Sequence, residues 1–189
     1  SISAGLIGYS NYTSKIINSI FAPADINISN KNGANFTRNK MPDITNSYYT
    51  VALDQGDNNN IKENRGQGKK AYTITAGDNT TIAYGSDEDE IKYSASGLTA
   101  YNGKPGLKFC KKRDNESDYC TYYAANGEEI ALTLGHSDIS GYNFSQYVVN
   151  AGTLSGEANP YTLTMPESDV TVASMYLKSL NHKDITVAK

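Results

Sequence analysis

The chain has 189 residues, of which 38% are hydrophobic and 20% are charged, with a formal net charge of -3. This length accommodates one large or two small domains, and the mild negative charge offers no basic surface to nucleic acid or to an anionic membrane. No run of sequence approaches the ~18 apolar residues of a membrane helix, so we expect neither nucleic-acid binding nor direct membrane insertion.

The residue bias favours β structure. Tyrosine occurs 15 times, phenylalanine 4 times and tryptophan never, and 16 glycines accompany abundant Asn, Ser and Thr. Tyr and Thr favour strands, whereas Gly and Asn favour the turns between them. The composition therefore predicts an all-β protein: one or two small β-sandwich or β-grasp-like modules of short antiparallel strands, with at most one short N-terminal helix.

Residues 1–69 are predicted to be a β-rich N-terminal segment, for which a degenerate module is one interpretation. Neither a signal peptide nor an initiating Met is visible at the start, so we expect a fragment of a longer protein. Residues 15–21 fit equally a short helix stopped by Pro23 and a strand rich in β-branched residues. Residues 48–53 predict a strand, and the polar stretch 54–70 predicts a long loop or a linker.

Residues 70–178 predict a second unit, in which strands and turns alternate at short spacing. The predicted strands are 70–75, 80–84, 91–94, 119–124, 129–134, 142–149, 161–165 and 170–177. Such spacing is typical of a sandwich or barrel-like β module. Residues 179–189 are then a linker or the start of a next module.

Two local features predict how these strands are arranged. Asn126-Gly127 is a hairpin turn sequence, and it predicts that the strands on either side of it pair. Alternation places Ile130, Leu132 and Leu134 on one face, which we expect to be the core face. Pro166 cannot donate to a ladder, so we expect it to separate the last two strands.

Four segments fall in an order that resembles a known family. They are Thr121-Tyr-Tyr-Ala-Ala-Asn-Gly-Glu-Glu-Ile-Ala-Leu-Thr133, Gly141-Tyr-Asn-Phe-Ser-Gln-Tyr-Val-Val149, Gly152-Thr-Leu-Ser-Gly156 and Tyr161-Thr-Leu-Thr-Met-Pro-Glu-Ser-Asp-Val-Thr-Val172. The order resembles the bacterial extracellular tandem repeats related to the internalin B-repeat, which combine a Gly-acidic-hydrophobic strand, a Gly-Tyr-x-Phe turn and a closing Thr-Met-Pro-x-x-Asp-Val-Thr-Val strand pair. The chain departs from this family in a long insertion between Gly85 and Tyr119.

The resemblance implies an architecture and a location. Repeats of this kind occur in tandem in bacterial surface proteins and adhesins, as stalks or binding modules without shared catalytic residues. The chain is therefore expected to be a non-catalytic module of a bacterial cell-surface or secreted protein, acting in adhesion or as a spacer. Its expected partners are neighbouring modules of the same chain and a host or matrix protein or glycan. A glycan-binding module and an ancillary domain of a large secreted enzyme are the alternatives.

Cys110 and Cys120 are the two cysteines of the chain. An even number of cysteines in an exported protein favours a disulfide, and free thiols are the alternative. The segment between them is very polar, so a covalent link across a hairpin would replace apolar packing there. Zinc is not expected, because no further Cys and only two His are present.

Two adjacent tyrosine pairs are candidate ligand-facing aromatics: Tyr48 with Tyr49, and Tyr122 with Tyr123. Neighbours on a strand point to opposite sides, so one ring of each pair is a candidate for exposure. Packing in the core or across strands is the favoured alternative, and the lack of tryptophan disfavours a dedicated carbohydrate platform.

No catalytic, metal or cofactor site is expected. His136-Ser137-Asp138 places three catalytic residue types side by side, but adjacent residues cannot form the successive hydrogen bonds of a triad. Residues 54–60 lack the alternating ligands of a calcium loop, and the consecutive carboxylates of residues 87–90 seldom converge on one ion. Solvated loops are the favoured interpretation of both acidic segments.

Overall fold

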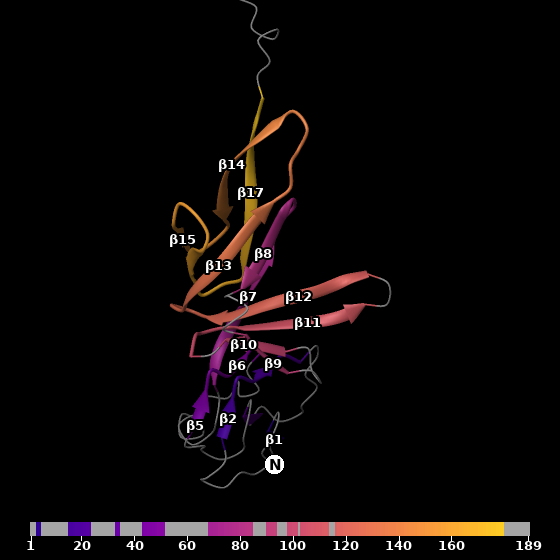
Figure 1. Ribbon diagram of the computed structural model, residues 1–189. Helices are drawn as coiled ribbons and strands as arrows, with labels where there is room; N and C mark the ends of the chain where they lie inside the picture. The colour runs from indigo at the N-terminus through magenta and orange to yellow at the C-terminus, as the bar shows by residue number, and fades with distance from the viewer. Residues whose placement is uncertain are drawn as a thin grey trace, which may run out of the picture.

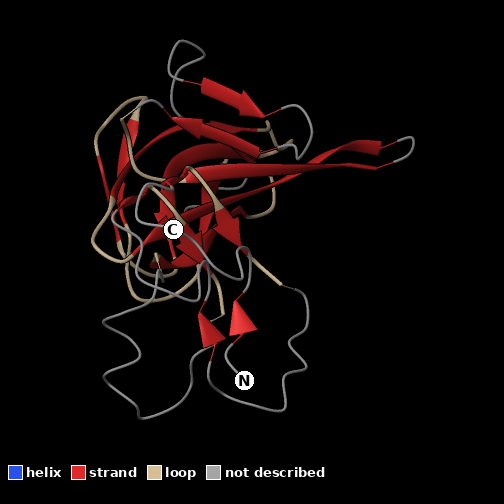
Figure 2. Ribbon diagram, turned by 90° about the horizontal axis from the view of Figure 1, so that it is seen from below, coloured by secondary structure: helices blue, strands red, loops and turns tan. Residues whose placement is uncertain are grey.

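A computed structural model describes residues 3–4, 15–23, 33–34, 43–51, 68–84, 90–93, 98–101, 103–113 and 116–179. Over these ranges the chain is all-β, as predicted, and it contains no helix that could cross a membrane (Figures 1 and 2). The acidic segments 54–60 and 87–89, which we expect to be solvated loops and not calcium sites, lie outside the described residues.

The early strands are short and the later ones long. In chain order they are β1 (Ser3–Ala4), β2 (Lys15–Ile17), β3 (Ile20–Phe21), β4 (Gly33–Ala34), β5 (Asp43–Thr45), β6 (Tyr48–Tyr49), β7 (Lys69–Ala76), β8 (Thr80–Tyr84), β9 (Glu90–Tyr93), β10 (Leu98–Tyr101), β11 (Leu107–Arg113), β12 (Glu116–Ala125), β13 (Glu129–His136), β14 (Tyr142–Val149), β15 (Thr153–Ser155), β16 (Tyr161–Thr164) and β17 (Val170–Lys178).

Two sheets pack together to form the main body. The larger sheet has the order β14-β17-β7-β12-β11-β10-β9, and β6 adds to it through β7. The smaller sheet has the order β15-β16-β13-β8. Figure 1 shows an elongated molecule, with β1 at one end and the last residues of β17 at the other.

The core lies between these sheets and follows the predicted alternation. Ile130, Leu132 and Leu134 of β13 are at most 3% exposed, and they pack against Ile74 of β7 and Val172 of β17. Each such side chain contributes roughly 1.5–3 kcal/mol when it is fully removed from water. The predicted core face of this strand is therefore confirmed.

The predicted hairpin at Asn126-Gly127 is wrong. A tight turn does form, closed by the Glu128 amide donating to Ala125 O at 3.1 Å. However, β12 pairs with β7 and β11, whereas β13 pairs with β16 and β8. The turn is thus a corner between the sheets, because this arrangement lets β12 and β13 direct their apolar faces into one core.

Parallel pairs accompany the expected antiparallel ones. β7 pairs in parallel with β6 at Lys69 and Lys70 and with β17 from Ile74 to Ala76. β16 and β17 belong to different sheets, as the placement of Pro166 between them predicts. Between β16 and β17 the chain crosses from the smaller to the larger sheet. After this crossing, β17 runs in the same direction as β7 and pairs with it in parallel.

The insertion between Gly85 and Tyr119 supplies most of one side of the larger sheet. Of its strands only residues 91–94 were predicted, and β10 and β11 were not. Cys110 and Cys120 are opposite each other on β11 and β12 and form a disulfide, as predicted. Figures 1 and 2 show that this hairpin extends to one side of the body.

The N-terminal segment contains a repeat that the sequence analysis did not identify. Lys15–Phe21 and Asp43–Tyr49 share the order Ile-x-Asn-Ser followed by two large apolar residues. They pair in parallel as β2–β5 and β3–β6, and β1–β4 pairs in the same sense. We call these three pairs the N-terminal stack, since parallel strands stacked at a similar sequence spacing are typical of repeat architectures.

The N-terminal stack decides between the two interpretations of residues 15–21. The segment forms strands, and Asn18 breaks them with a φ of 50°, a left-handed conformation that a helix would not contain. Tyr48 and Tyr49 pair with Lys69 and Lys70, so the stack continues directly into β7. The division of the chain into domains at residue 69 stays a prediction.

Replacing both cysteines with serine should lower the free energy of unfolding by about 2.5 to 3 kcal/mol, since the unfolded chain loses a covalent loop. Urea unfolding of the variant, with and without reductant, measures this difference. Reductant should destabilise the natural chain by the same amount and leave the variant unchanged. Equal stability of the oxidised natural chain and the variant would contradict the expectation.

Candidate functional site

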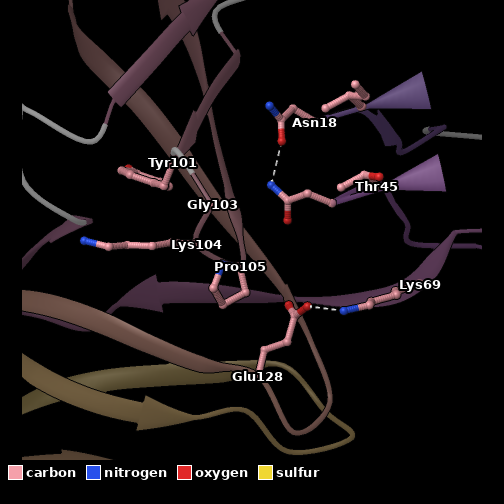
Figure 3. Close-up of a pocket in the computed structure, with 10 residues that line it drawn as sticks. Asn18, Thr45, Lys69, Tyr101, Gly103, Lys104, Pro105 and Glu128 are labelled. Carbon is pink, nitrogen blue, oxygen red and sulfur yellow. Dashed lines mark hydrogen bonds and ion pairs between the residues drawn. The ribbon is translucent and has the colours of Figure 1, made fainter. Parts of the chain in front are cut away.

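An open cleft of about 460 Å³ lies where the N-terminal stack meets the sandwich. We call it the junction cleft, and its polar lining residues are Asn18, Thr45, Asn46, Lys69, Lys104 and Glu128. Figure 3 shows Asn18 and Thr45 on one side, Tyr101 and Lys104 on the other, and the Lys69–Glu128 ion pair below them.

Asn18 and Asn46 occupy the cleft because they end equivalent strands of the repeat. Both adopt positive φ, at 50° and 45°, a conformation that Asn tolerates better than most residues. Their side chains lie one above the other, and Asn46 Nδ2 donates to Asn18 Oδ1 at 2.8 Å. Such an asparagine ladder fixes the register of stacked strands.

Tyr48 connects the N-terminal stack to the sandwich. Its ring is fully buried, and its hydroxyl accepts a hydrogen bond from the Gly106 amide at 2.9 Å. The single hydroxyl proton is shared among acceptors, with Asn46 Oδ1 at 2.6 Å and the Glu128 carboxylate oxygens at 3.0 and 3.1 Å. One atom thus joins three distant segments.

Glu128 completes this network from the corner between β12 and β13. Its carboxylate accepts a hydrogen bond from the Ala125 amide and forms an ion pair with Lys69, each at 2.8 Å. The Glu128 side chain is only 9% exposed, whereas that of Lys69 is 62% exposed. Because solvent screens Lys69, the ion pair contributes little stability, and the bonds to Tyr48 and Ala125 position the carboxylate.

Burial raises the pKa of Tyr48 well above its usual value near 10, and the nearby Glu128 carboxylate adds to the effect while the Gly106 amide opposes it. Burial likewise raises the pKa of Tyr84 strongly. Both hydroxyls are therefore neutral at physiological pH. Tyr48 is consequently a hydrogen-bond donor and not a base.

A stack of tyrosine rings lies behind the cleft. Tyr84 packs against Tyr101 and Tyr122, with ring centroids 4.7 and 5.0 Å away. The Tyr122 hydroxyl donates to Ile82 O at 2.9 Å. Gly106 passes so close to the Tyr84 ring that a side chain there would collide with it, and its φ of 98° also favours glycine.

Each pair of candidate tyrosines has one buried ring and one half-buried ring. Tyr48 and Tyr122 are buried, which corrects their assignment as candidates, because their rings fill the core and their hydroxyls bond internally. Tyr49 and Tyr123 are half-buried, and Tyr123 packs against the core cluster around Tyr48. Packing in the core, which was the alternative interpretation, is therefore the observed role of Tyr48, Tyr122 and Tyr123.

A second aromatic cluster lies at the other end of the sandwich and was not predicted. It consists of His136, Phe144, Tyr147, Tyr161 and Tyr176, contributed by β13, β14, β16 and β17. His136 stacks on Phe144 at 3.8 Å, and its Nδ1 lies 3.0 Å from the Tyr147 hydroxyl. Tyr147 and Tyr161 meet at 77°, so these rings pack on one another and do not form one flat platform.

The chemistry available in the junction cleft is hydrogen bonding. Its amide, ammonium and carboxylate groups suit a polar ligand with hydroxyl groups. Within the described ranges, no three His, Cys, Asp or Glu side chains come together as a metal site. His136 contacts aromatic rings, an arrangement that gives it a packing role.

Tyr48→Phe should reduce the free energy of unfolding by about 1–3 kcal/mol, because it leaves the buried Gly106 amide without its acceptor. Urea unfolding followed by circular dichroism measures the loss. Tyr142→Phe is the matched control, since Tyr142 is 47% exposed and this change should have no measurable effect. A Tyr48→Phe protein as stable as the control would refute the role of this hydroxyl.

The stability of the fold should decrease at alkaline pH. Below the ordinary tyrosine pKa of about 10, both folded and unfolded chains keep these protons, and stability is constant with respect to them. Above it, the unfolded state releases protons that folded Tyr48 and Tyr84 retain, so stability falls by about 1.4 kcal/mol per pH unit for each group. Urea unfolding up to about pH 11 tests this, and Tyr48→Phe should show a shallower decline.

Comparison with protein-family models, with curated proteins and with solved structures found no match to this chain.

Proposed function

We propose that the chain is a non-catalytic module of a bacterial cell-surface or secreted protein, and that it acts as a spacer in adhesion. The similarity of residues 121–172 to internalin-type repeats supports this proposal, as does the Cys110–Cys120 disulfide, which is consistent with an oxidising, extracellular location.

The observation that carries the proposal is the position of the first and last strands. β1 lies at one end of the elongated body, and the last residues of β17 lie at the opposite end (Figure 1). A module with this geometry adds its full length to a linear array, whereas a module with adjacent ends adds little. The stack, the junction and the sandwich follow one another along this axis.

Glycan binding is the second candidate, and the junction cleft favours it. Asn18, Asn46 and Lys104 bring amide and ammonium groups to an open hollow of about 460 Å³. Sugar hydroxyls are suited to such groups. The aromatic cluster around Phe144 gives less support, because its rings are tilted.

The two functions differ in what the purified chain should bind. A spacer should show no saturable binding on a panel of glycans and host matrix proteins. Within a full-length surface protein, an unrelated β module of equal end-to-end length should replace it without loss of adhesion. Saturable binding of one sugar that is lost in Lys104→Ala, but not in Lys178→Ala at the far end, would instead establish the junction cleft as a glycan site.

A further inference from the structure

We propose that β7 and β17 form a clamp that resists tension along the molecule. The proposal rests on the spacer function, because a spacer between a cell and its attachment point is stretched through its two ends. The clamp itself is a property of the fold and can be measured separately.

The parallel pairing of β7 and β17 gives the clamp its geometry. The chain enters β7 at Lys69 from the side of the N-terminal stack and leaves β17 at Lys178 on the opposite side (Figure 1). The strands run side by side, with Val170 opposite Ile74 and Val172 opposite Ala76. Tension applied through these two points pulls neighbouring strands in opposite directions along their length.

The hydrogen bonds between β7 and β17 are roughly perpendicular to the direction of the applied tension. The Gly77 amide donates to Val172 O at 2.8 Å, and the Thr75 and Thr171 hydroxyls lie 3.2 Å apart. Sliding must stretch these bonds together, whereas separation from one end would break them one after another. A parallel ladder pulled from opposite ends is therefore in its most resistant orientation.

Side chains at both ends of the ladder extend the clamp beyond the backbone pairs. The Thr73 amide donates to Asp169 Oδ1 at 2.8 Å below the ladder. Above it, the Ser174 amide donates to Thr80 Oγ1 at 2.7 Å, and the Thr80 and Ser174 hydroxyls lie 2.8 Å apart. Thr80 is a buried polar residue, so its bonds are shielded from competing water.

Each strand of the clamp is also held on its other side. β17 pairs with β14 from Val172 to Lys178, and β7 pairs with β12 from Ala71 to Ile74. The side chains of Ile74, Val170 and Val172 are at most 1% exposed within the core. Sliding β17 past β7 must therefore disrupt packing in the core as well as the ladder.

Single-molecule pulling of the whole chain, flanked by reference modules, tests the direction of load. One experiment pulls from both ends of the chain. The other pulls between a handle on Asp78→Cys and the C-terminal end of β17. These two points lie at the same end of the ladder, so this load opens the ladder one bond at a time. The end-to-end rupture force should be several-fold higher, and equal forces in the two directions would overturn the clamp.

A pair of variants separates the clamp from general stability. Thr80→Val keeps the side-chain shape but removes the hydroxyl that bonds to β17, whereas Ile130→Val removes a methylene from the core on β13. Both should lower equilibrium stability modestly. Thr80→Val should lower the end-to-end rupture force clearly more than Ile130→Val does, because only Thr80 bonds directly to β17. An equal reduction in both variants would refute the proposal.

The disulfide identifies the rupture event in the same recordings. Cys110 and Cys120 are 10 residues apart, so their bond withholds roughly 33–36 Å of extended chain when the sandwich opens. The strongest event should lengthen by this amount in reductant, and an unchanged length would show that the clamp is not the structure that broke. A low rupture force would end the clamp proposal and leave the spacer intact, whereas saturable sugar binding on the panel would end the spacer proposal alone.

Discussion

The buried hydroxyl of Tyr48 connects the N-terminal stack to the sandwich. It lies in the interior and bonds to the turn at Asn46, to the Gly106 amide and to Glu128 at the corner between the sheets. A buried polar group left without partners costs roughly 1–3 kcal/mol, so these three segments are held in one arrangement. The hydrogen bonds of this one oxygen atom therefore link the N-terminal stack, the insertion and the sandwich.

Tyrosine rings also form part of the core of the sandwich. Tyr84, Tyr101 and Tyr122 provide large apolar rings for a core with few other bulky side chains. A phenol also carries a polar group that can bond to backbone at a sheet boundary, as Tyr122 does with Ile82. Among the described residues, Tyr48, Tyr84, Tyr101 and Tyr122 are therefore tyrosines that serve internal packing.

β7 connects the two ends of the molecule and would carry tension in the proposed spacer. It receives the N-terminal stack through β6 and pairs with β12 on one side and β17 on the other. In the proposed spacer, tension in β6 is therefore passed through its pairing with β7 to the last strand. The disulfide arm of β11 and β12 lies to the side of this path, so its covalent bond secures the hairpin and not the axis (Figure 1).

Several features could be predicted from the residues alone, because alternation, turn residues and an even cysteine count are read from the sequence. They are the all-β class, most strands beyond residue 70, the core face of β13, the break at Pro166 and the disulfide as the favoured state of the two cysteines. The sequence also contained the repeat of Ile-x-Asn-Ser, which a search for internal similarity would have found. Three features became visible only in the folded chain: Asn126-Gly127 joins two sheets, Tyr48 and Tyr122 face inward, and β17 lies parallel to β7. A turn sequence specifies the bend of the backbone, whereas the partner of each strand depends on which apolar faces can share one core.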